Sequence, residues 1–269
     1  MKIERNNLSK LPRINQPIDN LDDLPFIPAE PLPIHGAIYF VGSPGSSKTS
    51  TMISMLTSHP TKKNKNKNLY YFKYFDSINI ISGSLSTLPS SFLNKLPENQ
   101  TYNKFDDDTL VDIIEKLQEG DNTNNLLILD DVIRDISRSK NLSKIFLNRR
   151  HILQNPEKEG QSKFSIWVVS QKYTLLPMEF RNALTAVFIW RSSNKNEINR
   201  IKDEIMHDLS TEEQDEVLYH AWKIPYSFLY VLLNAPKKDK YYVKFDKIIF
   251  DENISYSDND NDETLENLK

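Results

Sequence analysis

A loop of small residues near residue 45 lies between an apolar segment and a helical pattern. The stretch from Tyr39 to Thr49 reads YFVGSPGSSKT, and a helix is expected over residues 50–57. A strand, a small-residue loop ending in Lys-Thr and a helix form the phosphate-binding P-loop pattern, strand–GxxxxGK[ST]–helix. Small residues let successive backbone N–H groups surround a phosphate, and the helix adds the positive end of its dipole. The residues predicted to bind a nucleotide are Gly42, Ser43, Pro44, Gly45, Ser46, Ser47, Lys48, Thr49 and Ser50.

One position departs from this pattern, because Ser47 stands where the glycine before the lysine is expected. Serine is small, and we expect Ser47 to keep helical backbone angles and the loop to keep its shape. Lys48 is predicted to reach the terminal phosphates, and the hydroxyl of Thr49 is predicted to bind Mg²⁺. A Ser/Gly turn with a solvated lysine is the alternative, so a second element has to support the first.

Two later apolar runs supply that support, since each ends in polar residues. The run 126–129 is typical of a strand buried in a parallel sheet, and Asp130 and Asp131 follow it. In a P-loop enzyme, Asp130 would hold the Mg²⁺ shell, and Asp131 would orient or deprotonate the attacking water. The run 164–169 predicts another buried strand, and Gln171 follows it as a candidate sensor of the γ-phosphate. Lys48, the two aspartates and Gln171 therefore form an ordered series.

Composition narrows the class of protein further. A chain of 269 residues can bury a sizeable core, and the absence of cysteine excludes disulfides and thiolate metal sites. No apolar run approaches the roughly 18 residues of a membrane span, and the N-terminus lacks the apolar region of a secretory signal. We expect a globular protein without a membrane-spanning segment.

The two ends of the chain differ from its middle. Residues 1–33 hold six of the 14 prolines, which predicts an extended N-terminal arm. Residues 251–269 carry seven acids and one lysine, which predicts a disordered acidic tail. The tail has a net charge of −6, so the other 250 residues sum to +3. This is a weak footprint for nucleic acid, and any such contact would need a local arrangement repeated around an oligomer.

Residues 34–250 are expected to form one domain. Alternating strand and helix patterns predict an α/β fold, a mainly parallel sheet flanked by helices. The order of Lys48, the aspartates and Gln171 puts a strand between the P-loop strand and the aspartate strand, as in RecA-like (ASCE) P-loop NTPases. The other expected elements are a first strand at 37–41, at least one strand within 69–75 and 78–82, a helix at 142–153 that carries Arg149 and Arg150, and a C-terminal β-hairpin formed by 227–233 and 241–250.

Four segments together carry a resemblance to a known family. They are residues 126–136, residues 147–151, residues 168–173, and Pro177 with residues 180–182. In this order they resemble the poxvirus-type genome-packaging ATPases of the FtsK/HerA superfamily, which occur in large DNA viruses and virophages. The similarity extends from about residue 34 to 204, and a weaker similarity covers residues 225–250.

The resemblance implies a ring, a pentamer or hexamer, that uses ATP and Mg²⁺ to drive double-stranded DNA into a preformed capsid. It further implies a capsid vertex or portal-like partner, and a location in the host cytoplasm, the virus factory or the virion. Arg150 matches the arginine of the family's Gly-Arg-His block, and Arg149 replaces its glycine. The candidates for an arginine finger, which would reach the γ-phosphate of a neighbouring subunit, are Arg150, Arg181 and Arg149, in that order.

Two alternatives stay open from the sequence. One is a DNA-segregation or conjugation-type ATPase of the same superfamily on a mobile element. The other is a non-hydrolysing P-loop structural protein in which Ser47 has weakened the site. The presence of Asp130, Asp131 and Gln171 favours hydrolysis over this second alternative.

Overall fold

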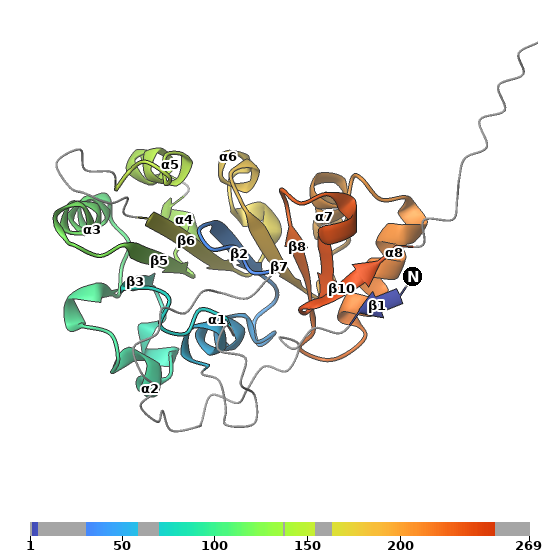
Figure 1. Cartoon of the computed structure of the whole chain (residues 1–269), viewed down its shortest axis with the longest axis horizontal. Helices are drawn as coiled ribbons and strands as arrows, with labels where there is room; N and C mark the ends of the chain where they lie inside the picture. The colour runs from blue at the N-terminus through green and yellow to red at the C-terminus, as the bar shows by residue number, and fades with distance from the viewer. Residues whose placement is uncertain (1, 5–30, 59–69, 137, 154–162, 251–269) are drawn as a thin grey trace, which may run out of the picture.

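The central feature of the fold is one mixed ten-stranded sheet (Figure 1). The computed structural model describes residues 2–4, 31–58, 70–136, 138–153 and 163–250. The strands lie in the order β1-β10-β9-β8-β7-β2-β6-β5-β3-β4. Their bounds are β1 Lys2–Glu4, β2 Ala37–Val41, β3 Ser77–Ser82, β4 Thr101–Tyr102, β5 Asn124–Asp130, β6 Lys163–Ser170, β7 Ala186–Trp190, β8 Phe228–Leu232, β9 Tyr241–Val243 and β10 Asp246–Ile249.

Six of these strands form a parallel block, and the other four extend it in antiparallel fashion. The pairs β7–β2, β2–β6, β6–β5, β5–β3 and β3–β4 are parallel. The remaining pairs, from β7–β8 to β10–β1, are antiparallel. Because β6 lies between β2 and β5, the P-loop strand and the aspartate strand are one strand apart, as the sequence predicts. The carboxyl ends of β2, β5 and β6 therefore share one edge of the sheet, where open α/β sheets place their ligands.

Helices cover both faces of the sheet. Figure 1 shows α1 and α2 below it and α3, α5 and α6 above it. The strands alternate their side chains accordingly: Ile38 and Phe40 of β2 pack in the cluster that contains α1, whereas Tyr39 and Val41 pack against the opposite helices. The helices are α1 Lys48–Thr57, α2 Ser90–Leu93, α3 Asp107–Glu119, α4 Ile133–Ile136, α5 Lys140–Leu147, α6 Met178–Asn182, α7 Lys195–Ile205 and α8 Thr211–Trp222. The predicted α/β fold with a mainly parallel, helix-flanked sheet is confirmed.

Two predicted elements differ in the structure. The helix predicted at 142–153 ends at Leu147, so Arg149 and Arg150 lie in the turns that follow it. At least one strand is predicted within 69–75 and 78–82, and β3 confirms this prediction, whereas residues 70–74 form turns in which Tyr70 and Lys73 have φ angles of 55° and 53°. The strand predicted at 241–250 is divided into β9 and β10 by a turn at Lys244, whose φ is 56°.

The ends of the chain are only partly described. β1 pairs with β10 of the same chain, so Lys2–Glu4 of the predicted arm adds an edge strand to the body. The rest of the arm up to residue 30 and the predicted tail at 251–269 lie outside the described residues. Within the described part of the chain, no helix is long and apolar enough to span a bilayer.

Candidate functional site

A pocket of about 300 Å³ opens at the carboxyl edge of the parallel strands. Three segments that are distant in sequence line it. The P-loop and α1 contribute Pro44, Gly45, Lys48, Thr49, Ser50 and Ile53. The ends of β5 and β6 contribute Asp130, Asp131, Val169 and Gln171, and the segment after β3 contributes Ser84, Thr87 and Pro89. The ordered series predicted from the sequence is thus gathered around one cavity.

The backbone of the P-loop turns through two residues with left-handed φ angles, Gly45 at 75° and Ser47 at 76°. Gly45 has a φ of 75°, and no atom lies within 4 Å of a Cβ built on it. Glycine is therefore favoured there by the left-handed backbone and not by a lack of space. Gly42 is limited by space instead, because a Cβ there would lie 2.6 Å from Cβ of Trp190. The hydroxyl of Ser46 is buried without a hydrogen-bond partner in the structure. The open space at Gly45, which lines the pocket, leaves room for a group such as a phosphate to approach the loop backbone.

Ser47 differs from the prediction of helical angles. Its φ of 76° and ψ of 17° lie in the left-handed region, and it precedes α1 as the N-cap without a side-chain cap hydrogen bond. The loop therefore keeps the backbone turn that glycine makes at this position of the motif, and serine adopts it under strain.

Replacing Ser47 by glycine should relieve this strain. We expect Ser47→Gly to raise the free energy of unfolding by about 1 kcal/mol, and the Tm by about 2–4 °C, in thermal or urea denaturation. The neighbouring Ser46 has no positive φ, so Ser46→Gly is the matched control and should lower stability through its greater unfolded-state entropy. Equal effects of the two substitutions would contradict the strain at Ser47.

Lys48 is folded back onto the loop. Its side chain is 8% exposed, and its Nζ donates to the carbonyl of Ser43 at 3.0 Å. Burial lowers the pKa of Lys48, and the nearby carboxylates of Asp131 and Asp130 oppose this effect. The ammonium thus lies among the carbonyl of the loop and the two acids that the sequence assigned to metal binding and catalysis.

Asp130 is the buried member of the acid pair. It is 2% exposed, and the Oγ of Ser82 at the end of β3 donates to its Oδ2 at 3.0 Å. Burial raises the pKa of Asp130 to about 6, assisted by the charge of Asp131 and opposed by the Ser82 hydrogen bond and by Lys48. A carboxylate held in this state gains from a divalent cation, because the cation replaces the hydration that burial removes.

Asp131 and Gln171 present exposed side chains to the same pocket. Asp131 has a φ of 54°, and its N–H donates to the carbonyl of Val169 on β6 at 3.3 Å. The left-handed turn directs the chain out of β5 at once, and Asp tolerates it better than most residues. Gln171 follows β6 directly, so the two candidate catalytic groups end adjacent strands.

The residues present fit a nucleotide with Mg²⁺. The small-residue loop with Lys48 at the pocket suits a phosphate, and the Thr49 hydroxyl with the Asp130 carboxylate is a donor set typical of Mg²⁺ in phosphate-transfer sites. Sequence reasoning missed Ser82, which holds Asp130, and the pocket wall at Ser84, Thr87 and Pro89. The sequence signal for these residues is their position at the end of the apolar run 78–82 or just after it.

The three candidate arginines lie in different surroundings. Arg149 is 8% exposed and donates to Thr185 Oγ1 at 3.0 Å, beside the start of β2 and thus at the sheet edge opposite the pocket. Arg181 is held by Glu204, with Nε to Oε2 at 2.8 Å, and by the carbonyl of Leu176. Arg150 is exposed in the turns next to Arg149. None of them lines the pocket of its own chain. Catalytic roles for Arg150 and Arg181 therefore stay predictions.

The fold and the pocket define a class: the chain has the α/β fold of P-loop NTPases, with the P-loop, both aspartates and Gln171 around one cavity. No protein-family model and no curated protein matches the sequence.

Solved structures do match the fold. The genome packaging NTPase B204 from Sulfolobus turreted icosahedral virus 2, in complex with ATP-gammaS, has 16% identity and a TM-score of 0.50, over 80% of this chain and 98% of that one. The DNA-packaging ATPase B204 from Sulfolobus Turreted Icosahedral Virus has 14% identity and a TM-score of 0.51, with the same coverage. At these identities the similarity establishes the fold, and it agrees with the fold that the sequence resemblance implies.

Proposed function

We propose that this protein is an ATP-driven double-stranded DNA translocase that packages a viral genome into a preformed capsid. The observation that carries the proposal is the shared pocket of Lys48, Thr49, Asp130, Asp131 and Gln171. A non-hydrolysing P-loop protein would have no need for a second acid and an amide beside the phosphate position. The fold similarity to genome-packaging NTPases supports the assignment to packaging.

Each residue has a defined task in this proposal. The P-loop amides and Lys48 hold the triphosphate, and Thr49 with Asp130 would hold Mg²⁺, which neutralises phosphate charge when it is bound. Asp131 orients or deprotonates the attacking water, and Gln171 contacts both this water and the γ-phosphate. Arg150, which is exposed and does not line the pocket of its own chain, suits an arginine finger supplied by a neighbouring subunit of a pentameric or hexameric ring.

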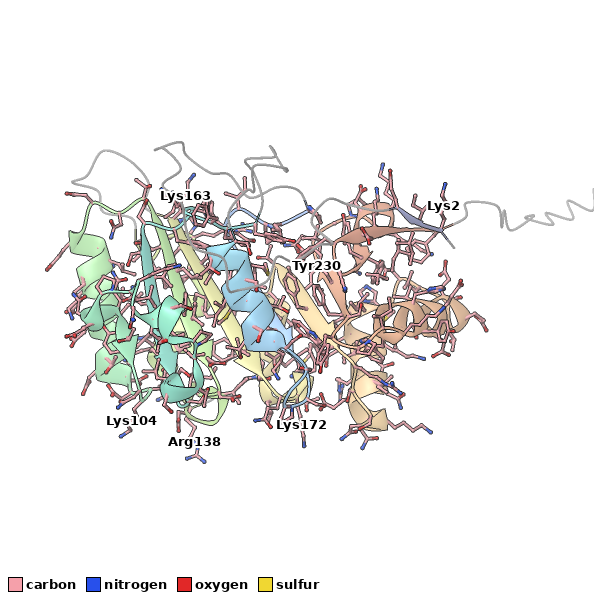
Figure 2. The ribbon with its side chains drawn as sticks, turned by 90° about the horizontal axis from the view of Figure 1, so that it is seen from below. Lys2, Lys104, Arg138, Lys163, Lys172 and Tyr230 are labelled. Atoms are coloured by element: carbon pink, nitrogen blue, oxygen red, sulfur yellow. The ribbon has the colours of Figure 1, made fainter. Side chains whose placement is uncertain are left out.

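Contacts with DNA would come from exposed cations at the pocket edge. Figure 2 shows Arg138 and Lys172 along this edge, whereas Lys163, at the other end of β6, lies at the opposite edge. Lys172 directly follows Gln171, so a phosphate contact there would be one residue from the sensor. Besides DNA and neighbouring subunits, the proposed partner is a capsid vertex or portal-like component. The proposed location is the host cytoplasm, the virus factory or the virion.

Turnover of ATP should rise when linear double-stranded DNA is added. The log of the DNA affinity should fall with log salt by about 0.9 per neutralised phosphate. The double variant Arg138→Ala/Lys172→Ala should reduce this slope by roughly 2. Lys163→Ala is the matched control and should leave the slope unchanged. Wild-type turnover equal to that of Lys48→Ala would refute the motor, and a flat salt response would refute backbone contacts.

A further inference from the structure

The direction of the Gln171 side chain depends on its two neighbours in the chain. Gln171 is exposed at the pocket wall, so packing does not fix its orientation. Ser170 before it is 1% exposed, and the segment after it forms a turn, Tyr173–Leu175. Whatever holds Ser170 and Lys172 therefore fixes the backbone of Gln171 and the direction in which its side chain leaves the chain.

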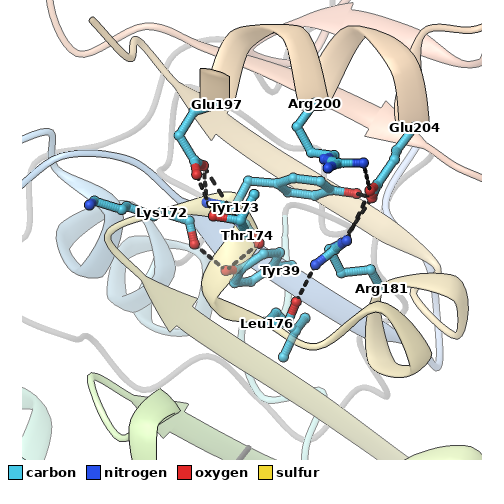
Figure 3. A network of polar contacts seen from close by, with 9 residues as sticks. All are labelled: Tyr39, Lys172, Tyr173, Thr174, Leu176, Arg181, Glu197, Arg200 and Glu204. Atoms are coloured by element: carbon cyan, nitrogen blue, oxygen red, sulfur yellow. Dashed lines mark hydrogen bonds and ion pairs between the residues drawn. The ribbon is translucent and has the colours of Figure 1, made fainter. Parts of the chain in front are cut away.

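The hydroxyl of Tyr39 contacts both neighbours at once, and Figure 3 shows its contact with Lys172. It lies 2.5 Å from Ser170 Oγ and donates to the carbonyl of Lys172 at 2.7 Å. Ser170 Oγ is itself 2.8 Å from the same carbonyl. The three oxygens form a triangle that links the residues on either side of Gln171. The two hydroxyls supply two protons, so two of the three contacts are hydrogen bonds at any moment, and each arrangement connects all three oxygens.

The same triangle is joined to the P-loop. Tyr39 belongs to β2, three residues before Gly42, and the N–H of Gly42 donates to the carbonyl of Ser170 at 3.2 Å. Ser170 is thus bound through its side chain and through its backbone to the strand that carries the phosphate loop. A displacement of the P-loop relative to β6 would therefore also displace Ser170 and, with it, Gln171.

The far side of the turn is held by α7 and α6. Glu197, 7% exposed, accepts from the N–H of Tyr173 at 2.7 Å, the N–H of Thr174 at 3.3 Å and the hydroxyl of Thr174. Glu204 accepts from the hydroxyl of Tyr173 at 3.0 Å and pairs with Arg181. Glu197 and Glu204 thus fix the turn from the side of α7, and the Tyr39 hydroxyl holds Lys172, the residue before the turn.

We propose that Tyr39 is a positioning residue that sets the orientation of Gln171 through Ser170 and Lys172. This inference rests on the proposed function, because Gln171 acts there as the sensor. The hydroxyl is separable from the rest of the side chain: the ring packs in the core, 6.0 Å between centroids from Tyr173, and phenylalanine would keep that packing. Burial raises the pKa of Tyr39, so the hydroxyl stays protonated at ordinary pH.

The test compares Tyr39→Phe with Tyr230→Phe. Tyr230 is an equally buried tyrosine whose hydroxyl donates to one backbone carbonyl, that of Pro31, at 2.7 Å, and it lies in the opposite core cluster. For Tyr39→Phe we expect kcat of ATP hydrolysis to fall roughly 10-fold or more, as misplacement of a reacting group does, with KM for ATP unchanged. Tyr230→Phe should keep the wild-type kcat. Ser170→Ala removes the other hydroxyl of the triangle, and it should likewise lower kcat while KM for ATP stays unchanged.

Amide hydrogen exchange of residues 171–174 gives a readout that does not need hydrolysis. It should accelerate in Tyr39→Phe and stay at the wild-type rate in Tyr230→Phe. Equal kcat values for the two variants, or unchanged exchange in Tyr39→Phe, would overturn the positioning role. If wild-type turnover equals that of Lys48→Ala, the proposed function fails, and exchange alone still decides whether Tyr39 orders the segment around Gln171.

Discussion

Asp131→Asn is expected to lower ATP turnover by roughly 10²–10⁴-fold, the usual contribution of a positioned general base. Asparagine has the shape of aspartate but cannot accept a proton from water. It also tolerates the left-handed backbone that Asp131 adopts with a φ of 54°, so the fold around the pocket should survive. Nucleotide affinity should stay near the wild-type value, because the P-loop and Lys48 are unchanged. Phosphate release under single-turnover and steady-state conditions measures the loss.

Two companion variants separate catalysis from binding. Asp135→Asn makes the same chemical change at an exposed acid just beyond the pocket, and it should retain wild-type turnover. Lys48→Ala should lose nucleotide affinity as well as turnover, since the lysine is predicted to contact the phosphates in the ground state. Full activity in Asp131→Asn would remove the carboxylate from the mechanism and leave Gln171 as the only candidate to orient the water.

The sequence was sufficient for the parts of the site that local pattern determines. Strand β2 has the predicted bounds, and the apolar runs before Asp130 and Gln171 form buried strands of a parallel block. Because parallel strands end at one edge, correct strands and a correct order bring Lys48, Asp130, Asp131 and Gln171 together. No side-chain detail is needed for that result.

Features that depend on tertiary contacts could not be predicted. The positive φ of Ser47 is imposed by the turn of the P-loop, against the preference of serine. Arg149 lies beyond the end of α5, and its partner Thr185 is 36 residues later in the sequence. Tyr39 has the appearance of an ordinary core residue of β2, and only the packing of β6 beside β2 gives its hydroxyl a role.

Asp130→Asn should stabilise the nucleotide-free protein at neutral pH, although it should weaken Mg²⁺ binding. The pKa of Asp130 rises from 3.8 to about 6 on folding, mainly through burial. The folded state therefore binds this proton more tightly than the unfolded state, so stability falls as pH rises from about 4 to 6 and stays lower above. At about 1.4 kcal/mol per pKa unit, the ionised carboxylate costs up to roughly 3 kcal/mol at pH 8.

Urea unfolding without Mg²⁺ measures this cost. The wild type should unfold at lower urea than Asp130→Asn at pH 8, and the difference should vanish below pH 4. Asparagine can still accept from Ser82, so the comparison isolates the charge. When Ser82→Ala is added to both proteins, the difference in their stability at pH 8 should increase, because the ionised Asp130 loses the hydrogen bond that favours it. A gap independent of pH would show that packing, and not the buried charge, separates the two proteins.

Addition of Mg²⁺ and ATP should reverse the order of the two proteins. A ligand that binds only the folded state stabilises it by mass action, and the wild type keeps the carboxylate that favours a cation. Asp130→Asn should gain much less from the same addition. The ionised Asp130 lowers the stability of the protein when the pocket is empty, and a bound cation would offset that loss. An equal gain in both proteins would contradict Asp130 as a metal ligand and would leave Thr49 as the sole predicted one.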